Sequence, residues 1–261
     1  MSVIHSTLGS SLPSNAIEYI TEDYHVTNEI QFILPISCFL MGYVVGPTLC
    51  GPLSENFGRK PVMLYPFIGY ILFTMACAVA PNWPSFLFFR FACGVCASAP
   101  VAVVGGLYAD IYSDPRKRGR AMAWFMAATT AGPVTAPALS GFIAQNISWR
   151  WVFGVATLFS AATLPLVAMM PETYVPVLLS RRAARLRKET GDQDIIAKSD
   201  LETKSAKYVI EVVLTRPYRM LMHELIVACV CAYCALAYAI FYMYFEVTRT
   251  PDSCIAPTSD I

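Results

Sequence analysis

The stretch Gly51–Pro61, with the sequence GPLSENFGRKP, is a short charged segment between two long uncharged runs. Residues 30–54 and 61–89 contain no Asp, Glu, Lys or Arg and are 25 and 29 residues long. About 20 helical residues, each rising about 1.5 Å, cross a hydrocarbon core of about 30 Å. The sequence therefore predicts two membrane-spanning helices joined by an elbow at residues 51–61.

The composition favours a membrane protein. Of the 261 residues, 56% are apolar and 14% are charged, whereas soluble domains average about 25% charged residues. The net charge of +1 provides no basic field for nucleic acid. Most of the nine cysteines lie in apolar runs, and the CxxC pairs at Cys93 and Cys231 have no second pair or nearby His, so we expect no metal or redox site.

The remaining uncharged runs predict an all-α chain with a bundle of spans over residues 1–171. The expected elements are a partial first span at 1–13, spans at 28–50, 61–80, 85–112, 120–145 and 149–170, a central loop at 172–222, a seventh span at 223–246 and a polar tail at 247–261. Residues 1–13 are too short to cross a bilayer, so we interpret them as the last half of a first span, with a free tail as the alternative.

Basic residues gather in three loops, at 51–61, 113–120 and 172–222. The predicted spans place these loops on one side, and the positive-inside rule makes that side cytoplasmic. In the third loop, Leu179, Ala183 and Leu186 follow a helical period among basic residues, which is typical of an amphipathic helix on an anionic leaflet. A solvated linker is an equally open alternative, and residues 208–213 permit a second such helix.

The elbow resembles the loop between the second and third spans of the major facilitator superfamily. The matching residues are Gly51, Leu53, Glu55, Gly58, Arg59 and Lys60. Asn56 departs from the pattern, since the family often has a basic residue there. Without further matches, glycine turns and basic residues beside a membrane are the alternative explanation of the segment.

The segment RFACGVCASAP resembles the fourth-span motif of the same family at Arg90 and Gly94. The resemblance implies that Arg90 lines the central cavity and takes part in proton coupling, while a side chain that snorkels to the headgroups is the alternative. Asp110 ends the same predicted span. The resemblance implies that Glu55, Arg59 and Asp110 form a charge cluster that locks one conformation.

The segment AGPVTAPALSG resembles the fifth-span antiporter motif at Gly132, Pro133, Pro137 and Gly141. Ala136 and Ser140 replace glycines that are common in the family, so an ordinary face of small packing residues is the alternative. The segments that start at Pro171 (PETYVPVLLS) and at Arg216 (RPYRML) resemble fungal drug:proton antiporters and polyamine-type transporters, although Leu225 replaces a proline that is common there.

The resemblance implies the first six-helix bundle of a major facilitator, with a partial first span, plus a seventh span. It implies proton-coupled export of small drug-like or cationic molecules from a plasma membrane, with a proton gradient and no cofactor. The expected partners are the lipid bilayer, a small-molecule substrate and a second half or full-length relative, but no nucleic acid. A non-transporting truncated chain, which includes an incomplete gene model, and a sugar-type facilitator are the alternatives. No enzyme motif competes, because HExxH, a phosphate loop and a nucleophile elbow are absent from the sequence.

Overall fold

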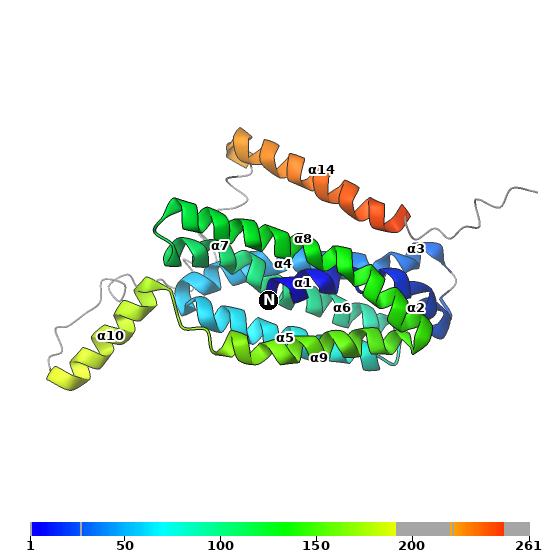
Figure 1. The fold of residues 1–261 in the computed structure, drawn as a ribbon, viewed down its shortest axis with the longest axis horizontal. Helices are drawn as coiled ribbons and strands as arrows, with labels where there is room; N and C mark the ends of the chain where they lie inside the picture. The colour runs from blue at the N-terminus through cyan, green and yellow to red at the C-terminus, as the bar shows by residue number, and fades with distance from the viewer. Residues whose placement is uncertain (1, 27, 192–219, 221, 248–261) are drawn as a thin grey trace, which may run out of the picture. The chain divides into compact units, whose positions relative to one another are not determined.

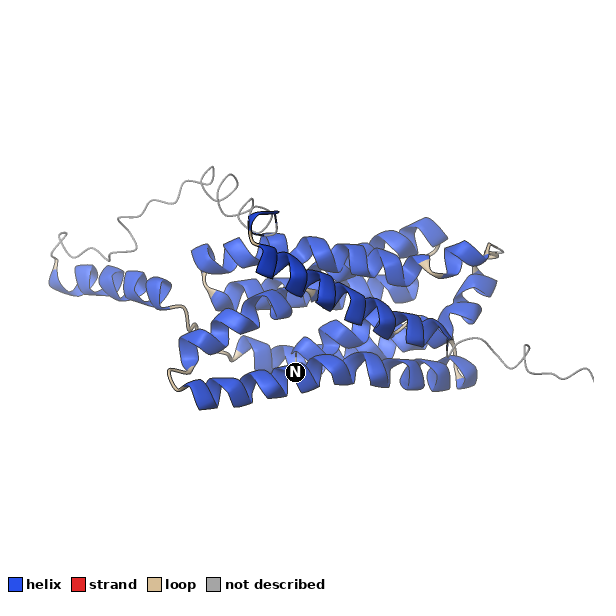
Figure 2. Cartoon of the chain, turned by 90° about the horizontal axis from the view of Figure 1, so that it is seen from above, coloured by secondary structure: helices blue, strands red, loops and turns tan. Residues whose placement is uncertain are grey.

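The computed structural model describes residues 2–26, 28–191, 220 and 222–247. The chain divides into two compact units, Met1–Val209 and Ile210–Ile261, and each is treated by itself (Figure 1). None of the described residues lies in a strand (Figure 2). The prediction of an all-α protein is therefore confirmed.

The first unit is a bundle of helices. Its elements are α1 (Ser2–Ser11), the 3-10 turn η1 (Ser14–Ala16), α2 (Ile17–Asp23), α3 (Glu29–Phe32), α4 (Leu34–Phe57), α5 (Arg59–Val79), α6 (Trp83–Ala97), α7 (Ala99–Ile111), α8 (Pro115–Asn146), α9 (Trp149–Ala168) and α10 (Val175–Thr190). The second unit contains α14 (Leu225–Val247).

Among the residues that the structure describes, four helical segments are long and apolar enough to cross a bilayer. They are Leu34–Phe57, Arg59–Val79, Trp83–Ile111 and Trp149–Ala168. The third combines α6 and α7, which continue across Ser98 because its N–H donates to the Gly94 carbonyl and its own carbonyl accepts from the Ala102 N–H. These segments cover the expected second, third, fourth and sixth spans.

Helix α8 occupies the expected fifth span but is not among these four segments. Its 32 residues are numerous enough, but its apolar side chains alternate with Thr, Gly and Ser, and basic residues occupy its first turns. Its crossing of the membrane remains a prediction. In the second unit, the apolar stretch Leu225–Ile240 of α14 is shorter than the four segments.

The first helix is packed within the bundle and is not a free tail. Figure 1 shows α1 in the middle of the bundle, where it contacts α4, α6, α7, α8 and α9. Seven of its residues are buried, and five of these are Ser or Thr. The hydroxyls of Thr7 and Ser10 donate to carbonyls one turn earlier, as from Thr7 to Val3 at 3.0 Å. The Ser6 hydroxyl instead bonds the Tyr43 hydroxyl of α4 at 3.1 Å.

The elbow predicted at residues 51–61 is shorter than expected. Helix α4 continues to Phe57 and α5 begins at Arg59, so Gly51 and Lys60 are helical and the expectation that they form a turn is wrong. Gly58 alone reverses the chain, with φ at 100°, a conformation that favours glycine. The Gly58 N–H still bonds the Ser54 carbonyl at 3.2 Å, which lets α4 continue to the reversal.

Helices α4 and α6 approach each other through glycines. A Cβ placed on Gly94 of α6 would lie 2.9 Å from the Phe39 carbonyl carbon, and a Cβ on Gly42 of α4 would lie 2.9 Å from the Val95 nitrogen. Both obstacles are backbone atoms, which cannot rotate away. Gly42 and Gly46 form a G-x-x-x-G pattern, which permits close helix contact in membranes.

This contact predicts opposite effects for two glycine substitutions in the same predicted span. We expect Gly94→Ala to lower the stability of the chain by about 1–3 kcal/mol, because the methyl group overpacks the α4–α6 contact. Gly105→Ala is the matched control, because a Cβ there meets no atom within 4 Å, and alanine raises helix propensity by up to about 1 kcal/mol. Thermal unfolding in detergent measures both. Equal midpoints for the two variants would contradict the predicted contact.

Candidate functional site

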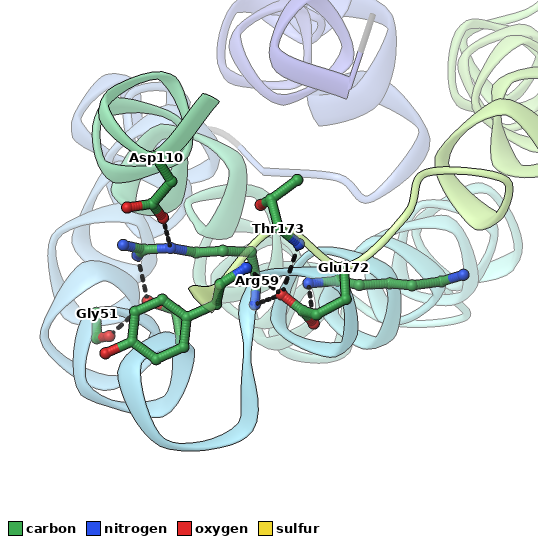
Figure 3. A network of polar contacts seen from close by, with 8 residues as sticks. Gly51, Arg59, Asp110, Glu172 and Thr173 are labelled. Atoms are coloured by element: carbon green, nitrogen blue, oxygen red, sulfur yellow. Dashed lines mark hydrogen bonds and ion pairs between the residues drawn. The ribbon is translucent and has the colours of Figure 1, made fainter. Parts of the chain in front are cut away.

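An ion pair joins two helix ends at one end of the bundle. Arg59 is the first residue of α5 and Asp110 lies near the end of α7. The Arg59 Nε donates to the Asp110 Oδ2 at 3.2 Å, and the two side chains are 11% and 24% exposed (Figure 3). The pair is therefore shielded but still reached by water.

The Arg59 guanidinium has further contacts with two other segments, and it also lies close to α7 at Gly106. Its Nη1 donates to the Ser54 Oγ at 3.0 Å, and Ser54 in turn donates to the Gly51 carbonyl at 2.7 Å. Its Cζ lies 5.1 Å from the ring centre of Tyr174. A Cβ on Gly106 would lie 2.8 Å from that Cζ, so glycine at this position of α7 leaves room for the guanidinium.

A second acid, Glu172, fixes the backbone beside this ion pair. Its Oε1 accepts from the backbone N–H groups of Arg59 at 2.9 Å and of Thr173 and Tyr174 at 3.0 Å each (Figure 3). Its Oε2 accepts from the Lys60 N–H at 3.2 Å. The first N–H groups of α5 have no partner within their own helix, so Glu172 caps them with a favourably placed negative charge.

The surroundings of Glu172 favour its ionised form. Burial alone would raise the pKa of this carboxyl, but the four backbone N–H donors outweigh burial and lower the pKa below its ordinary value. A Cβ on Gly58 would lie 2.8 Å from the Glu172 Cδ. The glycine thus provides both the chain reversal and the space for the carboxylate.

The structure brings together two of the three acids and bases expected in the charge cluster. Arg59 and Asp110 are paired, whereas the Glu55 side chain is exposed on the last turns of α4. Within the described residues, the second carboxylate that bonds Arg59 comes from Glu172 and not from Glu55. Sequence reasoning did not assign it a role, although an acid directly after the sixth span, on the same side as the elbow, was the available signal.

Arg90 lies in the interior of the bundle, only 2% exposed. Its guanidinium donates to the carbonyls of Pro35 at 3.2 Å, Gly9 at 3.0 Å and Ser10 at 3.4 Å. The Gly9 carbonyl would normally accept from the residue four positions later, which is Pro13 and has no N–H. Arg90 therefore caps the carboxyl end of α1, where a positive charge is favourable, and the expected alternative of snorkelling to the headgroups is wrong.

Aromatic rings complete the surroundings of this guanidinium. The Arg90 Cζ lies 4.8 Å from the ring centre of Phe39 and 5.7 Å from that of Phe153. Gly94, one turn further along α6, packs against the α4 backbone as described above. The two matching residues of the fourth-span motif thus tie α6 to both α1 and α4.

The fifth-span motif forms the contact between α8 and α1. A Cβ on Gly132 would lie 2.8 Å from the Leu8 nitrogen, whereas the nearest atoms to a Cβ on Gly141 are 3.4 Å away, in Asn15. Asn15 also donates to the Pro137 carbonyl at 3.0 Å. Pro133 and Pro137 lie inside α8. Ala136 and Ser140 are fully buried, so these replacements for glycine still fit the packing face.

The described residues contain no group of three or more His, Cys, Asp or Glu side chains placed to hold a metal ion. The site described above consists of the two arginines, their carbonyl and carboxylate partners, and close helix contacts.

Comparison with known proteins agrees with this architecture. The family model described as Major Facilitator Superfamily matches residues 1–250. The chain is 37% identical to an MFS-type transporter, mpsC, of Macrophomina phaseolina over 94% of its length and 48% of that protein. It is 35% identical to polyamine transporter 3 of Saccharomyces cerevisiae, covering 90% of this chain and 38% of that one. The multidrug transporter TPO1_2 of Candida glabrata is 33% identical, over 94% of this chain and 42% of that protein.

A solved structure supports the fold. The proton:xylose symporter XylE, bound to 6-bromo-6-deoxy-D-glucose, superposes with a TM-score of 0.61 at 17% identity, over 80% of this chain and 54% of that one. The chain spans about half the length of the curated relatives it matches. These relatives and this neighbour are transporters and not enzymes. With its apolar helices and a family match over nearly its whole length, the chain is an integral membrane protein that belongs to the Major Facilitator Superfamily.

Proposed function

We propose that this chain forms the first bundle of a proton-coupled exporter of small drug-like or cationic molecules. The observation that carries the proposal is the Arg59–Asp110 pair, which water can reach. Glu172 holds the start of α5 through the Arg59 backbone N–H, independently of this ion pair. The multidrug and polyamine relatives support the substrate class. The proton gradient supplies the energy, and no cofactor is needed.

The Arg59–Asp110 pair acts as a gate in this proposal. Glu172 bonds the Arg59 backbone N–H and not its guanidinium, so the side chain can leave Asp110 without releasing the end of α5. Fully exposed ion pairs contribute about 0–1 kcal/mol, and this partly shielded pair, 11% and 24% exposed, contributes more but less than a fully buried pair. Substrate binding and rocking of the bundles can therefore shift the equilibrium. Glu55 is exposed and can join the cluster only in another conformation.

Arg90 contributes to proton coupling as a positioning residue. Its hydrogen bonds to the Gly9 and Ser10 carbonyls hold the end of α1 beside α6. Arg90 and Gly94 thereby shape the wall of the central cavity, and the antiporter-like contact at Gly132, Pro133, Pro137 and Gly141 holds the other side of α1.

The proposal includes a sidedness and a partner. Loops 51–61, 113–120 and 172–222 face the cytoplasm, following their basic residues, and the membrane is the plasma membrane. Residues 172–222 connect the first bundle to the span at 223–246. Substrate sites of such transporters lie between two bundles, so a second bundle, from the same protein or a full-length relative, completes the cavity.

The proposed function is tested on the protein encoded by the full-length transcript, reconstituted in liposomes. We expect an imposed pH gradient to drive saturable movement of spermidine or a cationic dye, and Arg90→Lys to slow it by at least about tenfold, because one ammonium cannot replace the planar donor fork. Xylose movement in the same liposomes would favour the sugar-type alternative. A transcript that ends at Ile261, with no movement of any substrate by this chain, would favour the non-transporting alternative.

The gate predicts that Asp110→Asn weakens the structure more than an identical loss of charge at Glu55. We expect Asp110→Asn to cost about 1 kcal/mol, or about 2–4 °C in thermal midpoint, because Arg59 loses its carboxylate. Glu55→Gln is the matched control and should stay within about 0.5 kcal/mol. Thermal unfolding of the 261-residue chain in detergent measures both, and equal shifts would contradict the pairing.

The cap at Glu172 predicts a stability that depends on pH. The folded-state pKa is lowered, so the stabilisation is present above the unfolded pKa of about 4.3 and is lost as the pH falls through the folded pKa. We expect Glu172→Gln to cost about 1 kcal/mol near pH 7 and less at acidic pH, because the native carboxyl becomes protonated as the pH falls through its lowered folded-state pKa. Glu189→Gln, at an exposed position of α10, should change nothing at either pH. A cost of Glu172→Gln that does not vary with pH would show that the charge is unimportant.

A further inference from the structure

Helix α10 has an apolar stripe and a basic stripe that are both exposed. The exposed fractions of the apolar side chains are 53% for Val175, 42% for Leu178, 52% for Leu179 and 39% for Leu186. The exposed basic residues are Arg181, Arg182, Arg185 and Lys188. The proposed gate and cavity use neither stripe.

The two stripes lie on adjoining faces of the helix. At 3.6 residues per turn, Val175, Leu179 and Leu186 lie within about 40° of one another around the axis. Arg185, Arg181 and Lys188 lie about 80–140° to one side of Val175 and form the basic face, which Leu178 borders at about 60°. Arg182 lies within the apolar stripe itself, about 20° from Val175. A helix with this division inserts its apolar side chains at the boundary between headgroups and acyl chains and directs its basic side chains to the phosphates.

The start of α10 is fixed at the end of the apolar bundle. Helix α9 ends at Ala168 and α10 begins at Val175. Between them, Glu172 bonds the first N–H groups of α5, and the Tyr174 ring lies under the Arg59 guanidinium. This linker fixes the start of α10 at the bundle end where the membrane-spanning helices end, so its first turn lies at the level of the lipid headgroups, and the rest of the helix runs outward from the bundle (Figure 1).

We propose that α10 binds the surface of an anionic membrane. The occupant of its exposed face is a layer of acidic phospholipid headgroups, recognised by Arg181, Arg185 and Lys188, with Leu179 and Leu186 seated among the upper acyl carbons. Charge complementarity carries this choice, because each basic residue near an anionic bilayer adds attraction that neutral lipids do not provide. The proposal is independent of transport and of which face of the membrane is cytoplasmic.

Hydrogen–deuterium exchange of the 261-residue chain in lipid nanodiscs tests this proposal. We expect the α10 amides to exchange at least about tenfold more slowly in discs with about 30% phosphatidylserine than in pure phosphatidylcholine discs. Salt at about 1 M should remove most of the difference, because it screens charges beyond about 3 Å. Replacing Arg181, Arg182, Arg185 and Lys188 with Gln should abolish the lipid dependence.

The chain offers a matched control for the charge substitutions. Arg116, Lys117, Arg118 and Arg120 are four exposed basic residues at the start of α8, and replacing them with Gln removes the same charge elsewhere in the chain. The α10 lipid dependence should survive this change. Equal protection of α10 in both lipids and in detergent would overturn the proposal and indicate a protein partner. Equally fast exchange in every condition would overturn it as well.

Discussion

A buried guanidinium in an apolar bundle must find hydrogen-bond acceptors, and the arrangement of the inner helices depends on how Arg90 does so. An unsatisfied buried polar group costs about 1–3 kcal/mol, and more if it is charged. Arg90 uses carbonyls from two other helices, Gly9 and Ser10 of α1 and Pro35 of α4. Pro13 has no N–H and leaves the Gly9 carbonyl without its usual helical partner. That free carbonyl is one of the acceptors that the buried Arg90 guanidinium requires.

The close contact between α4 and α6 also serves the hydrogen bonding of Arg90. Arg90 reaches the Pro35 carbonyl because Gly42 and Gly94 let the two helix backbones approach each other. Lipid tails are as apolar as leucine side chains, so close packing and hydrogen bonds, rather than hydrophobicity, hold such helices together. The glycines and the arginine therefore act together. Gly94 packs closely against α4, and the Arg90 side chain of the same helix extends to the carbonyls of α1.

The sequence predicted what depends on composition and local period. Uncharged runs predicted the four long apolar helical segments, because hydrocarbon excludes charge over a fixed length. The helical period of Leu179, Ala183 and Leu186 predicted the helix that the structure contains as α10. The pairing of Arg59 with Asp110 followed from the family resemblance. The position of Glu172 after the sixth span indicated an acid at this end of the bundle, but its role as a cap did not follow, because the cap depends on backbone N–H groups that any sequence has. The length of the elbow also escaped prediction, since only the φ angle of Gly58 ends α4. The second helix expected near residues 208–213 lies outside the described residues.

The two arginines differ in what their release would cost, and this difference assigns them different roles. Freeing Arg90 would leave a charge and three carbonyl contacts unsatisfied in a low dielectric, so its contacts persist through any rearrangement of the bundle. Arg59 is bonded to a carboxylate at the edge of water, 24% exposed, so exchanging Asp110 for solvent costs its side chain less than releasing Arg90 would. Because Glu172 holds the Arg59 backbone, that exchange leaves α5 and the start of α10 in place. A bundle that rocks as a unit needs a rigid interior and, at one end, an ion pair that can break at a small cost in free energy.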